Sequence, residues 1–245
     1  LCRQPWCDGN VGMMGISWGG FNGLQVAARQ PEALKAIITL CSTDDRYADD
    51  IHYKGGNLLM ENFGWAATML NFSAAVPDPL LVGDDWKDLW HQRLDAMPLL
   101  AETWLQHQTR DDDWRHGSVC EDYAKIKAAV YAVGGWGDAY RNTVSRLMQN
   151  LPGPKKAMIG PWIHKYPHFA GPNPAIGFLQ EAKGWWDHWL KGIENGVMDD
   201  ASCTFYLQDI LPPKGSYAER PGIWVLTSGW PDSQVQWTDF SLGEH

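Results

Sequence analysis

Hydrophobic positions along the chain follow two alternating patterns. Four short, nearly continuous apolar runs are typical of strands buried on both faces of a sheet. They lie at residues 11–16, 36–40, 129–133 and 156–159. Apolar residues at helical spacing predict helices over 21–29 and 142–151, and a longer helix over 178–193. Because strand and helix alternate, we expect a parallel sheet with helices packed on its faces.

Two segments depart from this alternation. Between 44 and 125, Trp, Leu, Met and charged residues recur at helical spacing, which predicts a mainly helical insertion. After Gly196, strand candidates at 203–207 and 223–226 are separated by Pro and Gly clusters, which indicates that a β domain starts there. We therefore expect four segments: core residues 1–43, the insertion 44–125, core residues 126–195 and the β segment 196–245.

The charge balance is acidic, with 20 Lys and Arg against 29 Asp and Glu. A chain without a basic run repels a phosphate backbone, so a nucleic-acid partner is not expected. No stretch of 18 apolar residues occurs, so a membrane span is not expected. The 5 cysteines are never spaced Cys-x-x-Cys, which argues against a disulfide framework or a zinc site. The 15 tryptophans indicate an aromatic-rich core and are compatible with an aromatic pocket.

One short motif carries candidate chemistry. The residues from Gly15 to Gly19 read G-I-S-W-G, which fits G-x-S-x-G, and they fall between a predicted strand and a predicted helix. At such a turn the serine, here Ser17, sits in a strained backbone conformation that lifts its hydroxyl above the sheet. We expect Gly15 and Gly19 to make room for the turn, and Gly20 and Gly23 to let the helix pack closely.

A serine hydroxyl needs a base to take its proton and an acid to orient that base. In hydrolases with this turn the three follow in the order Ser, Asp or Glu, His, each after a strand. Asp138, in GGWGDAY, and His164, in MIGPWIHKYPH, meet this requirement. The alternative interpretation of Asp138 is that it only caps the next helix. His164 and His168 have the spacing of a metal pair, but Pro167 disfavours the helix that such a pair needs, so no metal is expected.

Several segments resemble those of the CocE/NonD family, which holds serine hydrolases of the cocaine-esterase and X-Pro dipeptidyl-peptidase type. The likeness covers nearly the whole chain. It is carried by GISWGG, GGWGDAY, IGPWIHKYPH and KGWWDHWLKGIENGVM, and in the insertion by HYKGGNLL and WLQHQTRDDDWRHGS. The resemblance implies an α/β-hydrolase fold with a helical cap, followed by the start of a C-terminal jelly-roll domain.

By this resemblance Ser17 is the nucleophile, Asp138 the acid and His164 the base, and no metal or organic cofactor takes part. The backbone N–H of Trp18 is one oxyanion donor. Family members usually take a second donor from a tyrosine well upstream of the nucleophile. The resemblance implies that this sequence begins after that tyrosine and after the early strands of the sheet. We therefore expect these 245 residues to be a piece of a longer enzyme.

The expected substrate is a small ester, an amide or a short peptide, cleaved through an acyl-enzyme. Family members that cleave α-amino acid esters carry acids directly after the catalytic Asp, where this chain has Ala139, Tyr140 and Arg141. Such substrates are disfavoured unless Asp44, Asp45 or another acid of the cap substitutes. Five aromatic residues are weaker candidates for the substrate pocket: Trp65, Trp90, Trp104, Trp136 and Tyr140.

Three other functions stay open at this point. An X-Pro dipeptidyl-peptidase would share the catalytic residues and differ in a pocket for an N-terminal dipeptide. A carbohydrate-binding or structural module would account for the tryptophans and the C-terminal β segment. An inactive fragment would follow from the missing oxyanion donor. The sequence is compatible with a homo-oligomer.

Overall fold

The computed structural model describes residues 1–199 and 201–243, which form two compact units. The core unit combines Leu1–Asp44 with Val119–His245. The helical unit is Asp45–Ser118, and it lies within the segment where the insertion is predicted. Among the described residues, no helix combines the length and the apolar character that crossing a membrane requires.

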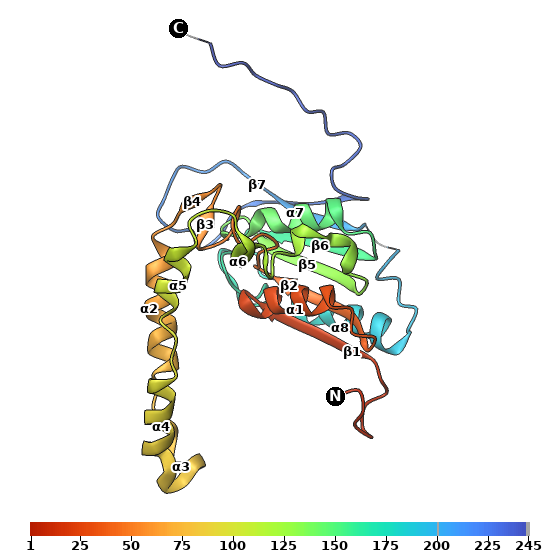
Figure 1. The fold of residues 1–245 in the computed structure, drawn as a ribbon. Helices are drawn as coiled ribbons and strands as arrows, with labels where there is room; N and C mark the ends of the chain where they lie inside the picture. The colour runs from red at the N-terminus through yellow and green to blue at the C-terminus, as the bar shows by residue number, and fades with distance from the viewer. Residues whose placement is uncertain (200, 244–245) are drawn as a thin grey trace. The chain divides into compact units, whose positions relative to one another are not determined.

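A six-stranded sheet forms the centre of the core unit, in the order β1-β2-β5-β6-β7-β8 (Figure 1). Its strands are β1 Val11–Ile16, β2 Leu34–Leu40, β5 Ala129–Gly135, β6 Lys155–Gly160, β7 Cys203–Gln208 and β8 Gly222–Thr227. The first five strands pair in parallel, and β8 pairs antiparallel with β7. Because the pairing from β1 to β6 is parallel, the loops after these strands all leave from one edge of the sheet.

Helices cover both faces of this sheet. Helices α1 (Trp18–Ala28) and α7 (Arg141–Asn150) contribute to one apolar cluster, which includes Ile37 of β2. Helix α8 (Phe178–Lys191) contributes to the other, which includes Ile38 of β2. Adjacent residues of β2 thus point to opposite faces, as the pleat requires, and both faces are buried. The core unit also has two 3-10 turns, η2 (Val119–Glu121) and η3 (Tyr123–Lys125).

These elements confirm the predicted α/β class with a mainly parallel sheet. The strand predicted over 11–16 has these bounds in the structure. Helix α1 begins at Trp18, three residues before the prediction, directly after the candidate nucleophile. The sequence pattern did not predict this first turn because Gly19 and Gly20 have low helix propensity. Burial of Gly20 stabilises the first turn of α1.

The strands after Gly196 differ from the expected start of a β domain. Strand β7 pairs in parallel with β6, from Ala157 opposite Cys203 to Ile159 opposite Phe205. Strand β8 then adds to β7, so both strands extend the main sheet. A jelly-roll domain is not seen within residues 1–199 and 201–243.

The helical unit contains five short helices and a two-stranded ribbon. Its elements are β3 Tyr53–Lys54, β4 Asn57–Leu58, α2 Glu61–Ser73, α3 Pro79–Val82, η1 Gly83–Asp85, α4 Trp86–Asp95, α5 Leu100–Gln106 and α6 Asp112–Arg115. Helix α2 packs against α5 (Figure 1). The buried apolar centre of the helical unit consists of Tyr53, Ala66, Trp104 and Trp114. The prediction of a mainly helical segment is therefore correct for this unit.

One buried histidine makes the stability of the helical unit depend on pH. His52 is 4% exposed, and its ring lies 4.4 Å from that of Trp104 and 5.2 Å from that of Trp114. Its Nδ1 shares a 3.0 Å hydrogen bond with Asn62 Oδ1. Burial, helped by the charge of Arg46, lowers the pKa of His52 from 6.5 to about 4.

We expect acid to destabilise this unit through His52. The unfolded chain binds the proton near pH 6.5 and the folded chain only near pH 4, so the stability is complete above pH 6.5 and is lost as the pH falls toward 4. The expected loss in the free energy of unfolding is about 2 kcal/mol at pH 5 relative to pH 7. Thermal melts at both pH values measure it. In His52→Gln the free energy of unfolding should change less between pH 7 and pH 5 than in the original protein, by that amount. An equal change in both proteins would contradict this account.

Candidate active site

Ser17 occupies the turn between β1 and α1 in a strained conformation. Its φ of 58° and ψ of −123° are unusual for any residue but glycine. The Ser17 N–H donates to the carbonyl of Leu40 in β2 at 2.9 Å, and the Ser17 carbonyl accepts from the Phe21 N–H at 2.9 Å. These bonds fix the turn to the neighbouring strand and to the first turn of α1. The sequence therefore places this serine at the strained turn that the motif predicts.

Two of the four expected glycines are required by space. A Cβ on Gly15 would lie 2.5 Å from the Cα of Gly19, and one on Gly20 would lie 2.8 Å from Thr39 Oγ1. A Cβ on Gly19 or Gly23 would meet nothing within 4 Å. Gly15 thus makes room for the turn and Gly20 lets α1 approach the sheet, whereas the expected roles of Gly19 and Gly23 are wrong.

We expect Gly15→Ala to destabilise the protein by about 2–3 kcal/mol, because its methyl group would collide with backbone that cannot move aside. Gly19→Ala is the matched control in the same turn. Its methyl group enters open space at the start of a helix, where alanine is favoured over glycine, so its free energy of unfolding should equal the original or exceed it by up to about 1 kcal/mol. Urea unfolding of both variants measures the difference, and equal stabilities would contradict the steric account.

Asp138 and His164 come from the loops after β5 and β6. The two loops lie against each other: the Gly137 N–H donates to the Trp162 carbonyl at 3.0 Å. A side chain at Gly135 would collide with that same carbonyl, so glycine is needed there. His164 Nδ1 lies 2.5 Å from Asp138 Oδ2. The Asp138 side chain is buried and that of His164 is 44% exposed, so a fixed acid holds an accessible base.

The other oxygens of Asp138 bind the residues that follow it. Oδ1 accepts the Tyr140 N–H at 2.6 Å, and the backbone carbonyl accepts from Arg141 Nη1 at 2.9 Å. Helix α7 begins at Arg141, and its N-cap position is Tyr140, so Asp138 is not the capping residue. The Tyr140 ring lies 5.9 Å from the His164 ring. The alternative prediction for Asp138, a plain helix cap, therefore does not describe its contacts.

The sheet topology places the candidate residues at one edge. Ser17 follows β1, Asp138 follows β5 and His164 follows β6, and these strands lie in one parallel run of the sheet. In open sheets of this kind, ligands bind outside the carboxyl ends of the strands. The three residues singled out from the sequence thus share the edge where substrates bind in such folds.

Cys41 is a neighbour of this group that the sequence did not single out. It follows β2 directly, is 5% exposed and has a φ of 44°. Its Sγ lies within 4.8 Å of ligand atoms of Asp138 and His164. Burial and the negative charge of Asp138 raise the pKa of the Cys41 thiol, so it stays protonated. Its position just after a buried strand, at the same edge as Ser17, was the available signal.

Cys41, Asp138 and His164 offer a sulfur, an oxygen and a nitrogen donor that lie close enough together to share a metal ion. The hydrogen bond between Asp138 and His164 already explains why two of them lie together. His168, the second member of the metal pair considered from the sequence, stacks on Phe178 and packs edge-on against Phe169.

The five aromatic pocket candidates fall in both units. In the helical unit Trp104 is buried, Trp65 packs on the same cluster, and Trp90 Nε1 donates to the Ala74 carbonyl at 2.8 Å. In the core unit Trp136 Nε1 donates to the Tyr206 carbonyl at 2.6 Å, and Trp136 lines a cavity of about 560 Å³. That cavity lies beside β7 and α7, and Ser17, Asp138 and His164 are not among the residues that line it. Tyr140 is buried next to His164.

Both acids considered for an α-amino group are already engaged. Asp44 is fully buried and ion-paired with Arg146. Asp45 pairs with Arg110 at 2.9 Å, within the helical unit. Burial alone would raise the pKa of Asp45, but the backbone N–H groups of its own loop and Arg110 outweigh burial and lower it. Neither carboxylate is therefore a ready partner for a substrate ammonium.

Comparisons with known proteins identify the family of this chain. Residues 1–166 match the family described as X-Pro dipeptidyl-peptidase (S15 family). Cocaine esterase from Rhodococcus sp. is 24% identical over 99% of this chain and 46% of its own length. A putative Xaa-Pro dipeptidyl-peptidase from Bacillus cereus is 26% identical over 94% of this chain and 36% of its own.

The fold has a counterpart among solved structures. A CocE/NonD family hydrolase from Staphylococcus aureus superposes with a TM-score of 0.74 at 18% identity. The match covers 97% of this chain and 38% of that one. The chain thus spans less than half the length of the relatives it matches.

Proposed function

Because this chain belongs to the X-Pro dipeptidyl-peptidase (S15) family, we propose that it hydrolyses a carboxylic ester or amide with Ser17 as nucleophile, His164 as base and Asp138 as orienting acid. The observation that carries this is the 2.5 Å hydrogen bond between the buried Asp138 carboxylate and His164 Nδ1. The strained turn at Ser17, on the same edge of the sheet, supports the assignment of the nucleophile.

The reaction has two acyl-transfer steps. With Nδ1–H donated to Asp138, His164 Nε2 is the acceptor that takes the proton of the Ser17 hydroxyl. Ser17 Oγ then bonds to the substrate carbonyl carbon, and the leaving group departs with the proton from His164. In the second step water gives a proton to His164 and its oxygen bonds to the carbonyl carbon. The bond from that carbon to Ser17 Oγ breaks as His164 returns the proton to Oγ, which frees Ser17 and the acid product.

Charge on the carbonyl oxygen needs a stabilising partner in both steps. Trp18 begins α1 directly after Ser17, so its backbone N–H is the proposed oxyanion donor. The partial positive charge at the N-terminus of α1 acts in the same direction. Tyr140, packed beside His164, is the proposed aromatic wall of the substrate site on that side.

The choice between simple esters or amides and X-Pro peptides depends on a partner for the substrate's ammonium group. An X-Pro dipeptidyl-peptidase is the second candidate, because the family's description and the name of the Bacillus cereus relative both give that activity. Such an enzyme must bind the terminal ammonium of its substrate, and a carboxylate is the usual partner. Asp44 and Asp45, the acids considered for that task, each hold an arginine. We therefore propose substrates without a free α-amino group.

Paired substrates test the proposal in the full-length gene product. A p-nitrophenyl acyl ester should release nitrophenol in a burst equal to the enzyme concentration, followed by slower turnover, as an acyl-enzyme requires. A p-nitroanilide of an Xaa-Pro dipeptide should be cleaved with a lower kcat/KM. A higher kcat/KM on the Xaa-Pro anilide would favour the peptidase, and cleavage of neither substrate class would overturn the proposal.

A further inference from the structure

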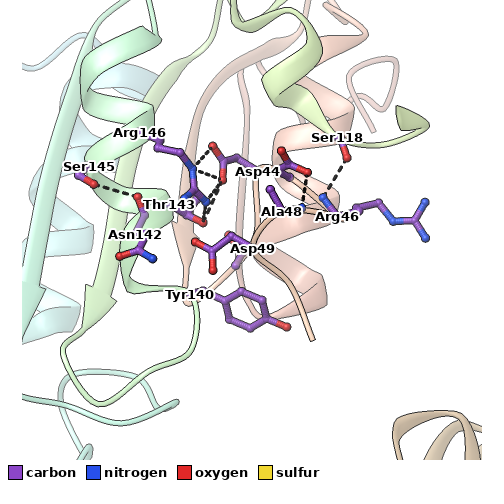
Figure 2. A network of polar contacts seen from close by, with 12 residues as sticks. Asp44, Arg46, Ala48, Asp49, Ser118, Tyr140, Asn142, Thr143, Ser145 and Arg146 are labelled. Atoms are coloured by element: carbon purple, nitrogen blue, oxygen red, sulfur yellow. Dashed lines mark hydrogen bonds and ion pairs between the residues drawn. The ribbon is translucent and has the colours of Figure 1, made fainter. Parts of the chain in front are cut away.

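The core unit contains a buried ion pair, between Asp44 and Arg146, that does not belong to the proposed triad. The Asp44 side chain has no exposed surface, and Arg146 Nε approaches both of its oxygens at 3.0 Å (Figure 2). Arg146 Nη2 adds a 2.5 Å contact to Oδ1, which also accepts from Thr143 Oγ1 at 3.1 Å. A carboxylate removed from water needs such partners, and here each oxygen has more than one.

This pair joins three segments that are distant in sequence. Asp44 ends the loop after β2, while Thr143 and Arg146 lie in the first two turns of α7. Tyr123, in the η3 turn, donates its hydroxyl to Asp44 Oδ2 at 2.5 Å. Burial and the nearby carboxylate raise the pKa of Tyr123, so it remains a donor at neutral pH. The Asp44 carboxylate is therefore the common anchor of the three segments.

Two of these segments contact Asp138 through residues other than Asp44 and Arg146. Helix α7 starts three residues after Asp138, and Tyr140 and Arg141, at its beginning, hold the Asp138 side chain and carbonyl. The loop that ends in Asp44 begins with Cys41, whose thiol lies against the Asp138 carboxylate. A shift of α7 relative to this loop would thus move Asp138 away from His164. Figure 2 shows Arg146 and Thr143 reaching from one segment to Asp44 on the other.

We propose that Asp44 and Arg146 are positioning residues, whose buried ion pair sets the place of Asp138 and so the hydrogen bond from Asp138 to His164. This inference rests on the proposed function of the triad. Catalytic geometry is sensitive to small displacements, and a misplacement of about 1 Å can lower the rate about a hundredfold. A pair that serves stability alone would leave the turnover of the folded enzyme unchanged.

Two variants of the full-length gene product test the proposal on a p-nitrophenyl ester. Asp44→Asn and Arg146→Met should lower kcat by about 10- to 100-fold and leave KM within about twofold. The acid limb of the kcat/KM profile should also move to lower pH, because a displaced Asp138 stabilises the His164 imidazolium less. That second readout separates positioning from a loss of folded protein.

Asp187→Asn is the matched control. The Asp187 carboxylate likewise pairs with two cations, Lys183 and Lys191. All three residues belong to α8 and none to the loops after β2 and β5. Its kcat and its acid limb should match the original protein. If Asp44→Asn does not fold, Arg146→Lys decides, because lysine keeps the charge but loses the two-pronged contact. It should give an intermediate fall in kcat.

Ser17→Ala, assayed alongside, separates the two levels of the account. If Ser17→Ala is inactive while the Asp44 and Arg146 variants keep the original kcat and acid limb, the positioning role is overturned and the triad stands. If Ser17→Ala keeps its activity, the proposed function fails and the positioning role fails with it. The inference is supported when Ser17→Ala is inactive, kcat and the acid limb shift together in the pair variants, and Asp187→Asn is unaffected.

Discussion

Ser17→Ala is expected to lower kcat about a millionfold, because removing the nucleophile of a serine hydrolase leaves only binding and oxyanion stabilisation. The variant should keep the fold. An alanine at this position loses one hydroxyl, while the bonds that fix the turn are made by the backbone of Ser17. Steady-state turnover is too slow to measure in this variant. Single-turnover assays with enzyme in excess over substrate therefore measure the fall in the rate.

Ser145→Ala is the control for that variant. Ser145 is half-buried on α7 and donates its hydroxyl to the Asn142 carbonyl of the same helix, so its loss removes a contact local to α7 and no part of the triad. Its kcat should equal that of the original protein. A Ser17→Ala enzyme with more than about one hundredth of the original kcat would exclude Ser17 as the nucleophile.

Asp138→Asn is expected to lower kcat about ten-thousandfold. An amide in place of the carboxylate presents an N–H to His164 Nδ1, which favours the tautomer with its proton on Nε2. That tautomer cannot accept the proton of Ser17. The side chain is buried and bonded to both His164 and the Tyr140 N–H, so the substituted residue has little freedom to turn away.

Asp122→Asn provides the comparison at a surface acid. Asp122 has a half-exposed side chain, which lies 3.9 Å from Lys125 and accepts the Ala124 N–H within its own turn. Turnover of a p-nitrophenyl ester by the two variants measures the difference. Equal kcat values for Asp138→Asn and Asp122→Asn would show that Asp138 has no part in catalysis.

The strands of the core could be predicted because they are buried on both faces. A strand such as β5 reads as an unbroken apolar run, and every one of its residues is buried. The start of α1 was missed because its first residues are chosen for the turn and for contact with the sheet, and they are poor helix formers. Local pattern therefore predicts an element best where packing and propensity favour the same residues.

The strand that β7 pairs with could not be predicted from the sequence pattern. Residues 203–207 read as a strand, but nothing in their pattern shows that β7 pairs with β6, about 45 residues earlier. The Pro and Gly clusters between β7 and β8 pointed to a new domain, whereas they connect two strands of one sheet. Pairing between distant segments is decided by the whole fold, and the local pattern does not contain it.

The candidate site was predicted in part. The order of Ser17, Asp138 and His164, each in a loop after a strand, is expected from the chemistry of a serine nucleophile and from the topology of the fold. The ion pair of Asp44 with Arg146 joins residues 102 apart, and neither belongs to a motif. Its role depends on which loops meet at one edge of the sheet, which only the three-dimensional structure gives.

Peptide mapping after reaction with a fluorophosphonate tests the central claim most directly. The reagent forms a stable bond to a serine only when a base activates that serine. The full-length gene product should carry one phosphonyl group, located by mass spectrometry on Ser17, and His164→Ala should lose it. An adduct on another residue, or none in an enzyme that hydrolyses esters, would contradict the account.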